Sequence, residues 1–83
     1  MYKRQLHYRM MLGYCLTKLE RYVEAERELL GAFEVIEETR DPDDGLAIEA
    51  MESLADLYED WGRPDDASRW RGRVDAAREE GGE

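Results

Sequence analysis

The stretch of sequence that decides the fold occurs twice: residues 12–25 read LGYCLTKLERYVEA, and residues 54–67 read LADLYEDWGRPDDA. The two copies superimpose at one constant offset of 42 residues. This offset pairs Leu12 with Leu54, Gly13 with Ala55, Leu16 with Tyr58, Arg21 with Arg63, Ala25 with Ala67, Arg27 with Arg69 and Ala32 with Val74. Self-similarity at a fixed period of this size indicates stacked supersecondary units. The chain therefore contains two copies of one unit.

Each copy extends outward into two helical patterns. Apolar residues at three-and-four spacing predict four helices, each burying one face. In the first unit the predicted stripes are Tyr8, Met11, Leu12, Cys15, Leu16 and Leu19, and, after a break at Glu20 and Arg21, Tyr22, Ala25, Leu29, Ala32, Phe33 and Ile36. In the second they are Ala47, Ala50, Met51, Leu54, Tyr58 and Trp61, and then Ala67, Trp70, Val74 and Ala77. We expect an all-α fold, a segment of α-solenoid with two tandem helix-turn-helix repeats and four antiparallel helices.

Helix boundaries follow from residues with special backbone preferences. Asp41 is suited to an N-cap and Pro42 to the first position of the third helix. Gly62 suits the left-handed residue that ends a helix, and Pro64 opens the fourth helix. We therefore expect a first repeat over residues 6–40, a second, C-terminal capping repeat over 41–79, and a disordered tail over 80–83.

The first five residues, MYKRQ, are set apart from this pattern. They resemble the translation of ATG-TAT-AAG-AGA-CAG, a transposon end used in preparing sequencing libraries. We therefore predict that residues 1–5 are a non-native leader and exclude them from fold reasoning. On this interpretation the chain is a metagenomic fragment, the C-terminal part of a longer repeat protein.

Composition excludes several classes of partner. The chain carries 12 basic and 21 acidic residues, a formal net charge of −9. Such a charge repels phosphate backbones and anionic membrane surfaces, so we expect neither nucleic acid nor membrane as a partner. No apolar run approaches the roughly 20 residues that span a bilayer. The single cysteine cannot form an internal disulfide, and we expect a cytoplasmic protein.

No combination of residues indicates catalysis. His7 and Cys15 are the only residues of their kinds. Eight positions along a helix place them about 80° apart and roughly 12 Å along the axis, so they cannot act as nucleophile and base. Neither a glycine-rich phosphate loop nor the spacing of a calcium loop is present. We expect no enzyme activity, no cofactor and no specific metal, and we expect Cys15 to be a small buried apolar residue on its packing stripe.

The repeated residues resemble the tetratricopeptide repeat (TPR) family. The residues that carry the likeness are Leu12-Gly13, Leu16, Tyr22, Ala25, Leu29 and Ala32, and in the second copy Leu54-Ala55, Tyr58, Gly62, Ala67 and Val74. The period of 42 exceeds the usual length of about 34 residues and is similar to that of kinesin-light-chain repeats. Arg71 stands where the family pattern has an aromatic residue, which predicts that the last helix faces solvent there while Trp70 covers the core.

This resemblance implies a protein or peptide partner held in an inner groove lined by the first helix of each repeat. The matching positions are His7, Met10, Tyr14, Thr17 and Lys18, and in the second repeat Glu49, Glu52, Asp56, Glu59 and Asp60. From Asp43 to Asp66 there are nine acids and one base, Arg63, which favours a basic partner. The acids of a charged stripe more often form an ordinary solvated helix face, and this alternative explains them without a partner.

The resemblance implies a scaffold that binds other proteins. An alternative is a C-terminal regulatory or docking appendage of a signalling enzyme, because residues 54–74 also resemble the last helix pair of some bacterial serine/threonine protein kinases. Two repeats fall short of the three or so that a solenoid needs for stability, so we also expect the isolated chain to self-associate.

Overall fold

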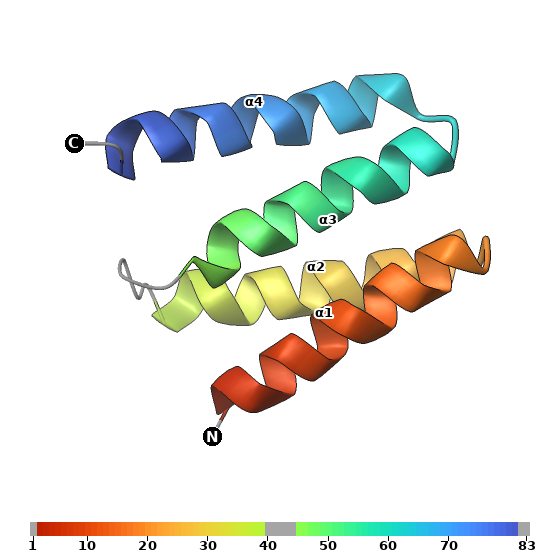
Figure 1. The fold of residues 1–83 in the computed structure, drawn as a ribbon, viewed down its shortest axis with the longest axis horizontal. Coiled ribbons are helices and arrows are strands. Elements are labelled where there is room, and N and C mark those ends of the chain that lie inside the picture. The colour runs from red at the N-terminus through yellow and green to blue at the C-terminus, as the bar shows by residue number, and fades with distance from the viewer. Residues whose placement is uncertain (1, 40–44, 82–83) are drawn as a thin grey trace.

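Helices make up most of the described part of the chain. The computed structural model describes residues 2–39 and 45–81, and these form α1 (Tyr2–Lys18), α2 (Tyr22–Thr39), α3 (Leu46–Asp60) and α4 (Pro64–Gly81) (Figure 1). Figure 1 shows α1 crossing in front of α2, α3 beside them, and α4 outermost on the far side of α3. The predicted all-α fold with four helices in two hairpins is confirmed.

The two turns within the repeats are copies of each other. Glu20 and Gly62, which are 42 residues apart, both adopt positive φ, 63° and 80°. At each turn, the amide of the residue after the left-handed one donates a hydrogen bond to the carbonyl five residues before it. The amide of the left-handed residue itself donates to the carbonyl three residues before it. This is the Schellman arrangement that satisfies the last helix carbonyls. The predicted left-handed Gly62 is confirmed, and Glu20 occupies the same conformation without being a glycine.

The backbone bonds of these turns show the repeat at atomic level. They are Leu19 N to Cys15 O, Glu20 N to Thr17 O, Arg21 N to Leu16 O and Ala25 N to Arg21 O, with their counterparts Trp61 N to Leu57 O, Gly62 N to Glu59 O, Arg63 N to Tyr58 O and Ala67 N to Arg63 O, all between 2.8 and 3.2 Å. An ion pair between Arg21 and Glu24 also recurs as Arg63 and Asp66. The 42-residue period is therefore structural as well as sequential.

The core lies between α2 and α3, and most of its members match the predicted stripes. In α2 the buried residues are Ala25, Leu29, Ala32, Phe33 and Ile36, with Tyr22 half-buried. In α3 they are Leu46, Ala50, Met51, Leu54, Ala55, Leu57 and Tyr58. In α4, Ala67 and Val74 are buried, while Trp70 packs edge-on against Phe33 with ring centroids 5.2 Å apart. The stripes predicted for these three helices are confirmed.

Four of the six residues of the stripe predicted for the first helix are wrong. Tyr8, Met11 and Leu19 are 68%, 67% and 65% exposed, and Cys15 is exposed as well. The residues of α1 that are buried are Leu6, Met10, Gly13, Leu16 and Thr17, so of the predicted residues only Leu16 is buried, while Leu12 packs half-buried against the core. The reason is the approach of α2, because a Cβ at Gly13 would lie 2.6 Å from Leu29 Cγ. The helix therefore turns its glycine toward Leu29, and its second apolar sector faces outward.

Two helix ends also differ from expectation. The third helix begins at Leu46, after Gly45 at its N-cap position, rather than at Pro42. The predicted cap, Asp41, lies outside the described residues together with Pro42. The fourth helix begins at Pro64 as predicted but runs to Gly81, so residues 80 and 81 belong to it rather than to a tail. Across the described ranges, none of the helices combines the length and apolarity required to cross a bilayer.

Candidate functional site

A pocket opens to solvent along the seam between α1 and α3. It has a volume of about 220 Å³ and is lined by His7, Met10, Met11, Tyr14 and Cys15 of α1 and by Glu49 and Ser53 of α3. The 42-residue offset relates His7 to Glu49 and Met11 to Ser53, so equivalent positions of the two repeats line one pocket. The stacking of the repeats therefore creates this site.

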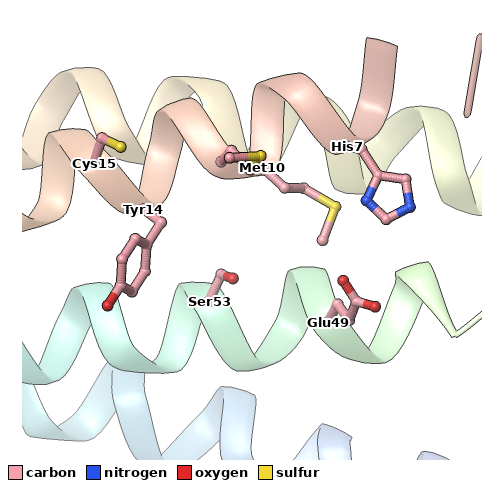
Figure 2. A pocket seen from close by; sticks show the side chains of 7 residues that line it. His7, Met10, Tyr14, Cys15, Glu49 and Ser53 are labelled. Atoms are coloured by element: carbon pink, nitrogen blue, oxygen red, sulfur yellow. The ribbon is translucent and has the colours of Figure 1, made fainter. Parts of the chain in front are cut away.

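The lining divides into an apolar floor and a polar end. Met10 is nearly fully buried, and its thioether side chain is held between the two helices (Figure 2). His7 and Glu49 are exposed and lie together at one end of the pocket, whereas Tyr14 extends from α1 toward α3 further along (Figure 2). Methionine fills irregular spaces and adapts its shape, so this floor suits side chains of more than one form.

Beyond Tyr14 the seam is closed by a cross-repeat ion pair. Lys18 Nζ lies 3.7 Å from Asp60 Oδ2 and 5.2 Å from the centre of the Tyr14 ring. Both charged side chains are about half exposed, so the pair contributes little to stability. The pair places one positive and one negative charge at the end of the seam that is opposite to His7 and Glu49.

The structure brings some of the predicted groove residues together and separates others. His7, Met10, Tyr14 and Glu49 line the pocket, and Lys18 and Asp60 continue the same seam. Thr17 does not belong to it, because its side chain is only 4% exposed and its hydroxyl donates to the Gly13 carbonyl at 2.8 Å. The prediction for Thr17 is therefore wrong: its hydroxyl bonds within its own helix.

Sequence reasoning misses three of the lining residues. The pattern of apolar residues places Met11 and Cys15 on the packing stripe of the first helix, and it gives no role to Ser53. The offset could have found Ser53, since it is the counterpart of Met11. Cys15 is a correction in its own right, because the thiol expected to be buried is exposed at the edge of the pocket.

The remaining three predicted acids face α4 instead. Asp56 and Glu59 both pair with Arg71, at 3.2 and 2.8 Å, and Glu52 pairs with Arg78. The hydrogen bond to Glu59 and the charge of both carboxylates raise the pKa of Arg71 above its ordinary value. These acids are therefore already neutralised by neighbouring guanidinium groups.

The repeat offset explains why these charges are at this end of the chain. Counterparts of Glu52 and Glu59 in the first repeat are Met10 and Thr17, and counterparts of Arg71 and Arg78 are Leu29 and Ile36, all buried. The ion-paired residues of α3 and α4 thus occupy the positions that are buried in α1 and α2. Stacking another helix there would desolvate these charges at high cost. The expected solvent exposure of Arg71 is confirmed.

An aromatic cluster fixes α3 against α2 below the seam. The ring of Trp61 stacks on Tyr22 and on Tyr58, with centroids 5.6 and 6.1 Å apart. The Tyr58 hydroxyl donates to Glu26 Oε2 at 2.7 Å. Burial and this hydrogen bond raise the pKa of Tyr58, so the hydroxyl keeps its proton. Glu49 and Ser53 are therefore presented by a helix that is firmly held.

Comparison with known proteins supplies the family. A family model described as tetratricopeptide repeat matches residues 6–74, a span that includes every residue lining the pocket. No curated protein and no solved structure matches the chain. Among the described side chains, His, Cys, Asp and Glu do not gather into a group of three that could hold a metal ion. The match extends over most of both repeats, and the chain belongs to the tetratricopeptide repeat family.

Proposed function

We propose that this chain binds a peptide segment of a partner protein along the seam between α1 and α3, with one side chain of the peptide entering the pocket. Tetratricopeptide repeats are interaction scaffolds and are typically non-catalytic. The observation that carries the proposal is the open pocket of about 220 Å³ that both repeats line. It is smaller than the roughly 300–1,000 Å³ of small-molecule sites, which favours a single side chain of a peptide as its occupant.

The chemistry of the lining favours a long cationic side chain. The floor of Met10, Met11 and Tyr14 suits an aliphatic stem, and Glu49 at the polar end suits a guanidinium or ammonium group. Glu49 makes no ion pair with any residue in the described ranges, unlike the α3 acids that pair with Lys18, Arg71 and Arg78. A basic peptide is also attracted by the net charge of −9.

Of the α3 acids that could attract a basic partner, this proposal assigns the charge contact to Glu49 alone. Glu52, Asp56 and Glu59 would have to exchange an arginine of α4 for one of the ligand, which brings little net gain. Glu49 would gain a partner without losing one. The peptide would therefore meet its strongest charge contact at the His7 end of the pocket.

Two variants test the site by fluorescence anisotropy. The probe is a labelled, lysine-rich heptapeptide with a central arginine, compared with the same peptide carrying citrulline, which is neutral and of the same shape. We expect Glu49→Gln to weaken binding of the arginine peptide by about ten-fold, the size of one charge-assisted hydrogen bond, and to leave the citrulline peptide unaffected. The matched control is Glu34→Gln, which removes an exposed carboxylate of α2 away from the seam.

A second substitution tests the pocket itself rather than the charge. Ser53→Trp fills the pocket from the α3 side, and it should abolish binding of both peptides while circular dichroism stays unchanged. Equal affinity of wild type, Glu49→Gln and Ser53→Trp for the arginine peptide, or failure of any basic peptide to bind, would contradict the proposal.

Three further expectations stay predictions. They are a cytoplasmic location, self-association of the isolated chain, and the alternative role as an appendage of a signalling kinase, which depends only on the likeness of residues 54–74.

A further inference from the structure

We propose that Tyr14 forms a second recognition position in the seam, which takes an aromatic side chain of the peptide whose cationic side chain enters the pocket. This proposal rests on the proposed function and deepens it, because it names the second side chain that the partner peptide carries. The partner is then a segment that combines one arginine or lysine with one phenylalanine, tyrosine or tryptophan at a fixed spacing.

The ring of Tyr14 is accessible to a ligand. Tyr14 is 52% exposed and extends from α1 toward α3, where the small side chain of Ser53 also lines the pocket (Figure 2). Among the described side chains, no other aromatic ring packs against Tyr14 and its hydroxyl makes no hydrogen bond. Tyr22 and Tyr58, by contrast, both stack on Trp61. Tyr14 therefore faces the seam with a ring that has no aromatic partner.

The exposure of Tyr14 belongs to the groove side of its helix. The counterpart of Tyr14 at the 42-residue offset is Asp56, whose side chain is 57% exposed although the first repeat packs beside α3. A helix stacked on α1 in the way that α1 stacks on α3 would therefore leave position 14 open. In the second repeat this position carries a carboxylate that pairs with Arg71, so that repeat offers no ring there.

Lys18 decides which kind of side chain fits the ring. Its Nζ lies 5.2 Å from the centre of the Tyr14 ring and 3.7 Å from Asp60 Oδ2. The first distance is within the range in which an aromatic ring attracts a cation, so one cation already occupies Tyr14. A second cation would meet Lys18 as a like charge, and an anion would compete with Asp60 for Lys18. An uncharged aromatic ring avoids both costs and packs against Tyr14 by stacking or edge to face.

The distance along the seam sets the spacing within the peptide. Tyr14 comes seven residues after His7 in α1, and the helical rise separates the two by about 10 Å. An extended peptide of the polyproline II type returns to the same side every three residues, after about 9 Å. An aromatic side chain three residues from the arginine therefore reaches Tyr14 while the guanidinium group lies at the His7 and Glu49 end.

Fluorescence anisotropy with labelled, lysine-rich peptides tests this position. Each peptide has a central arginine; two carry phenylalanine, three residues after or three residues before the arginine, and the reference peptide carries alanine at both positions. We expect the phenylalanine peptide whose chain direction matches the seam to bind about five-fold more tightly than the reference. A second arginine in place of this phenylalanine should gain no more than about two-fold in high salt, where long-range attraction is screened.

Three variants assign the gain to Tyr14. Tyr14→Leu removes the ring and keeps an apolar side chain, so the gain from phenylalanine should fall below about two-fold, whereas Tyr14→Phe keeps the ring and should keep the gain. The matched control is Tyr8→Leu, which removes a ring that is 68% exposed on the same helix but outside the pocket, and it should leave the gain unchanged. Leucine suits a helix, so circular dichroism should match the wild type; if it does not, methionine replaces leucine at both positions.

Glu49→Gln separates the second position from the pocket. It should weaken the reference and the phenylalanine peptide by the same factor, because effects about 10 Å apart are additive. A loss in Glu49→Gln without any gain from phenylalanine, or an equal gain in wild type and Tyr14→Leu, overturns the second position and leaves the pocket proposal intact. An equal gain from phenylalanine and from a second arginine overturns it as well. Failure of every peptide to bind overturns both proposals.

Discussion

The left-handed residue that ends α1 offers the sharpest test of the repeat. Glu20 has φ of 63°, and its counterpart Gly62 has φ of 80°. A side chain in this region places Cβ too close to the carbonyl oxygen that follows, which costs roughly 1–2 kcal/mol, whereas glycine has no such contact. The first repeat therefore carries a strain that the second avoids. We predict that Glu20→Gly stabilises the protein.

The magnitude follows from two opposing effects. Removing the strain gains about 1–2 kcal/mol, and the greater freedom of glycine in the unfolded chain costs about 0.5–1 kcal/mol. The net gain is about 0.5–1 kcal/mol. For a domain of this size each kcal/mol moves the melting temperature by about 4–8 °C, so we expect a rise of about 2–8 °C. Because the Glu20 side chain is exposed, little packing is lost.

Urea and thermal unfolding followed by circular dichroism measure this difference. Glu20→Gln is the control, because it removes the charge from an acidic protein and keeps the strained backbone; its stability should stay within about 0.5 kcal/mol of wild type. The reciprocal substitution, Gly62→Glu, should destabilise by the same net amount, about 0.5–1 kcal/mol. A Glu20→Gly variant that is no more stable than Glu20→Gln would refute the assignment of backbone strain to this turn.

Two further predictions concern the packing of the helices. A Cβ added at Gly72 of α4 would meet nothing within 4 Å, so Gly72→Ala should stabilise the protein by about 0.5–1 kcal/mol. A Cβ added at Gly13 would lie 2.6 Å from Leu29 Cγ, so Gly13→Ala should destabilise the protein by about 1–3 kcal/mol before the gain in helix propensity is counted. Equal effects of the two substitutions in urea unfolding would contradict the close contact between Gly13 and Leu29. Burial raises the pKa of Tyr58 above its ordinary value of 10.0. The stability that the protonated Tyr58 hydroxyl contributes is therefore fully present below pH 10 and is lost as the pH rises above 10. Tyr58→Phe should therefore be less stable than wild type by about 1 kcal/mol at pH 7, with the difference shrinking in unfolding experiments above pH 10; a difference independent of pH would count against the buried hydrogen bond to Glu26.

The candidate site was only partly accessible from sequence. The helix positions His7, Met10, Tyr14 and Glu49 follow from the family pattern, because the repeat fixes which helices form the seam. The ion pairs that the α3 acids form with α4 do not follow from the family pattern. Asp56 and Glu59 are 15 and 12 residues from Arg71 in sequence, and only the packing of α4 on α3 brings them within an ion-pair distance.

Residues 12–25 and 54–67 by themselves determined the number of helices, the two turns and the 42-residue repeat, because these depend on local backbone preferences and on a spacing that one chain displays twice. The buried side of α1 was decided only by the tertiary structure. This helix has apolar residues on two sectors, Leu6, Met10 and Leu16 on one and Tyr8, Met11 and Cys15 on the other. Periodicity detects both and cannot choose, since the choice depends on which sector lets Leu29 approach Gly13. The same choice leaves the other sector of α1 exposed to solvent.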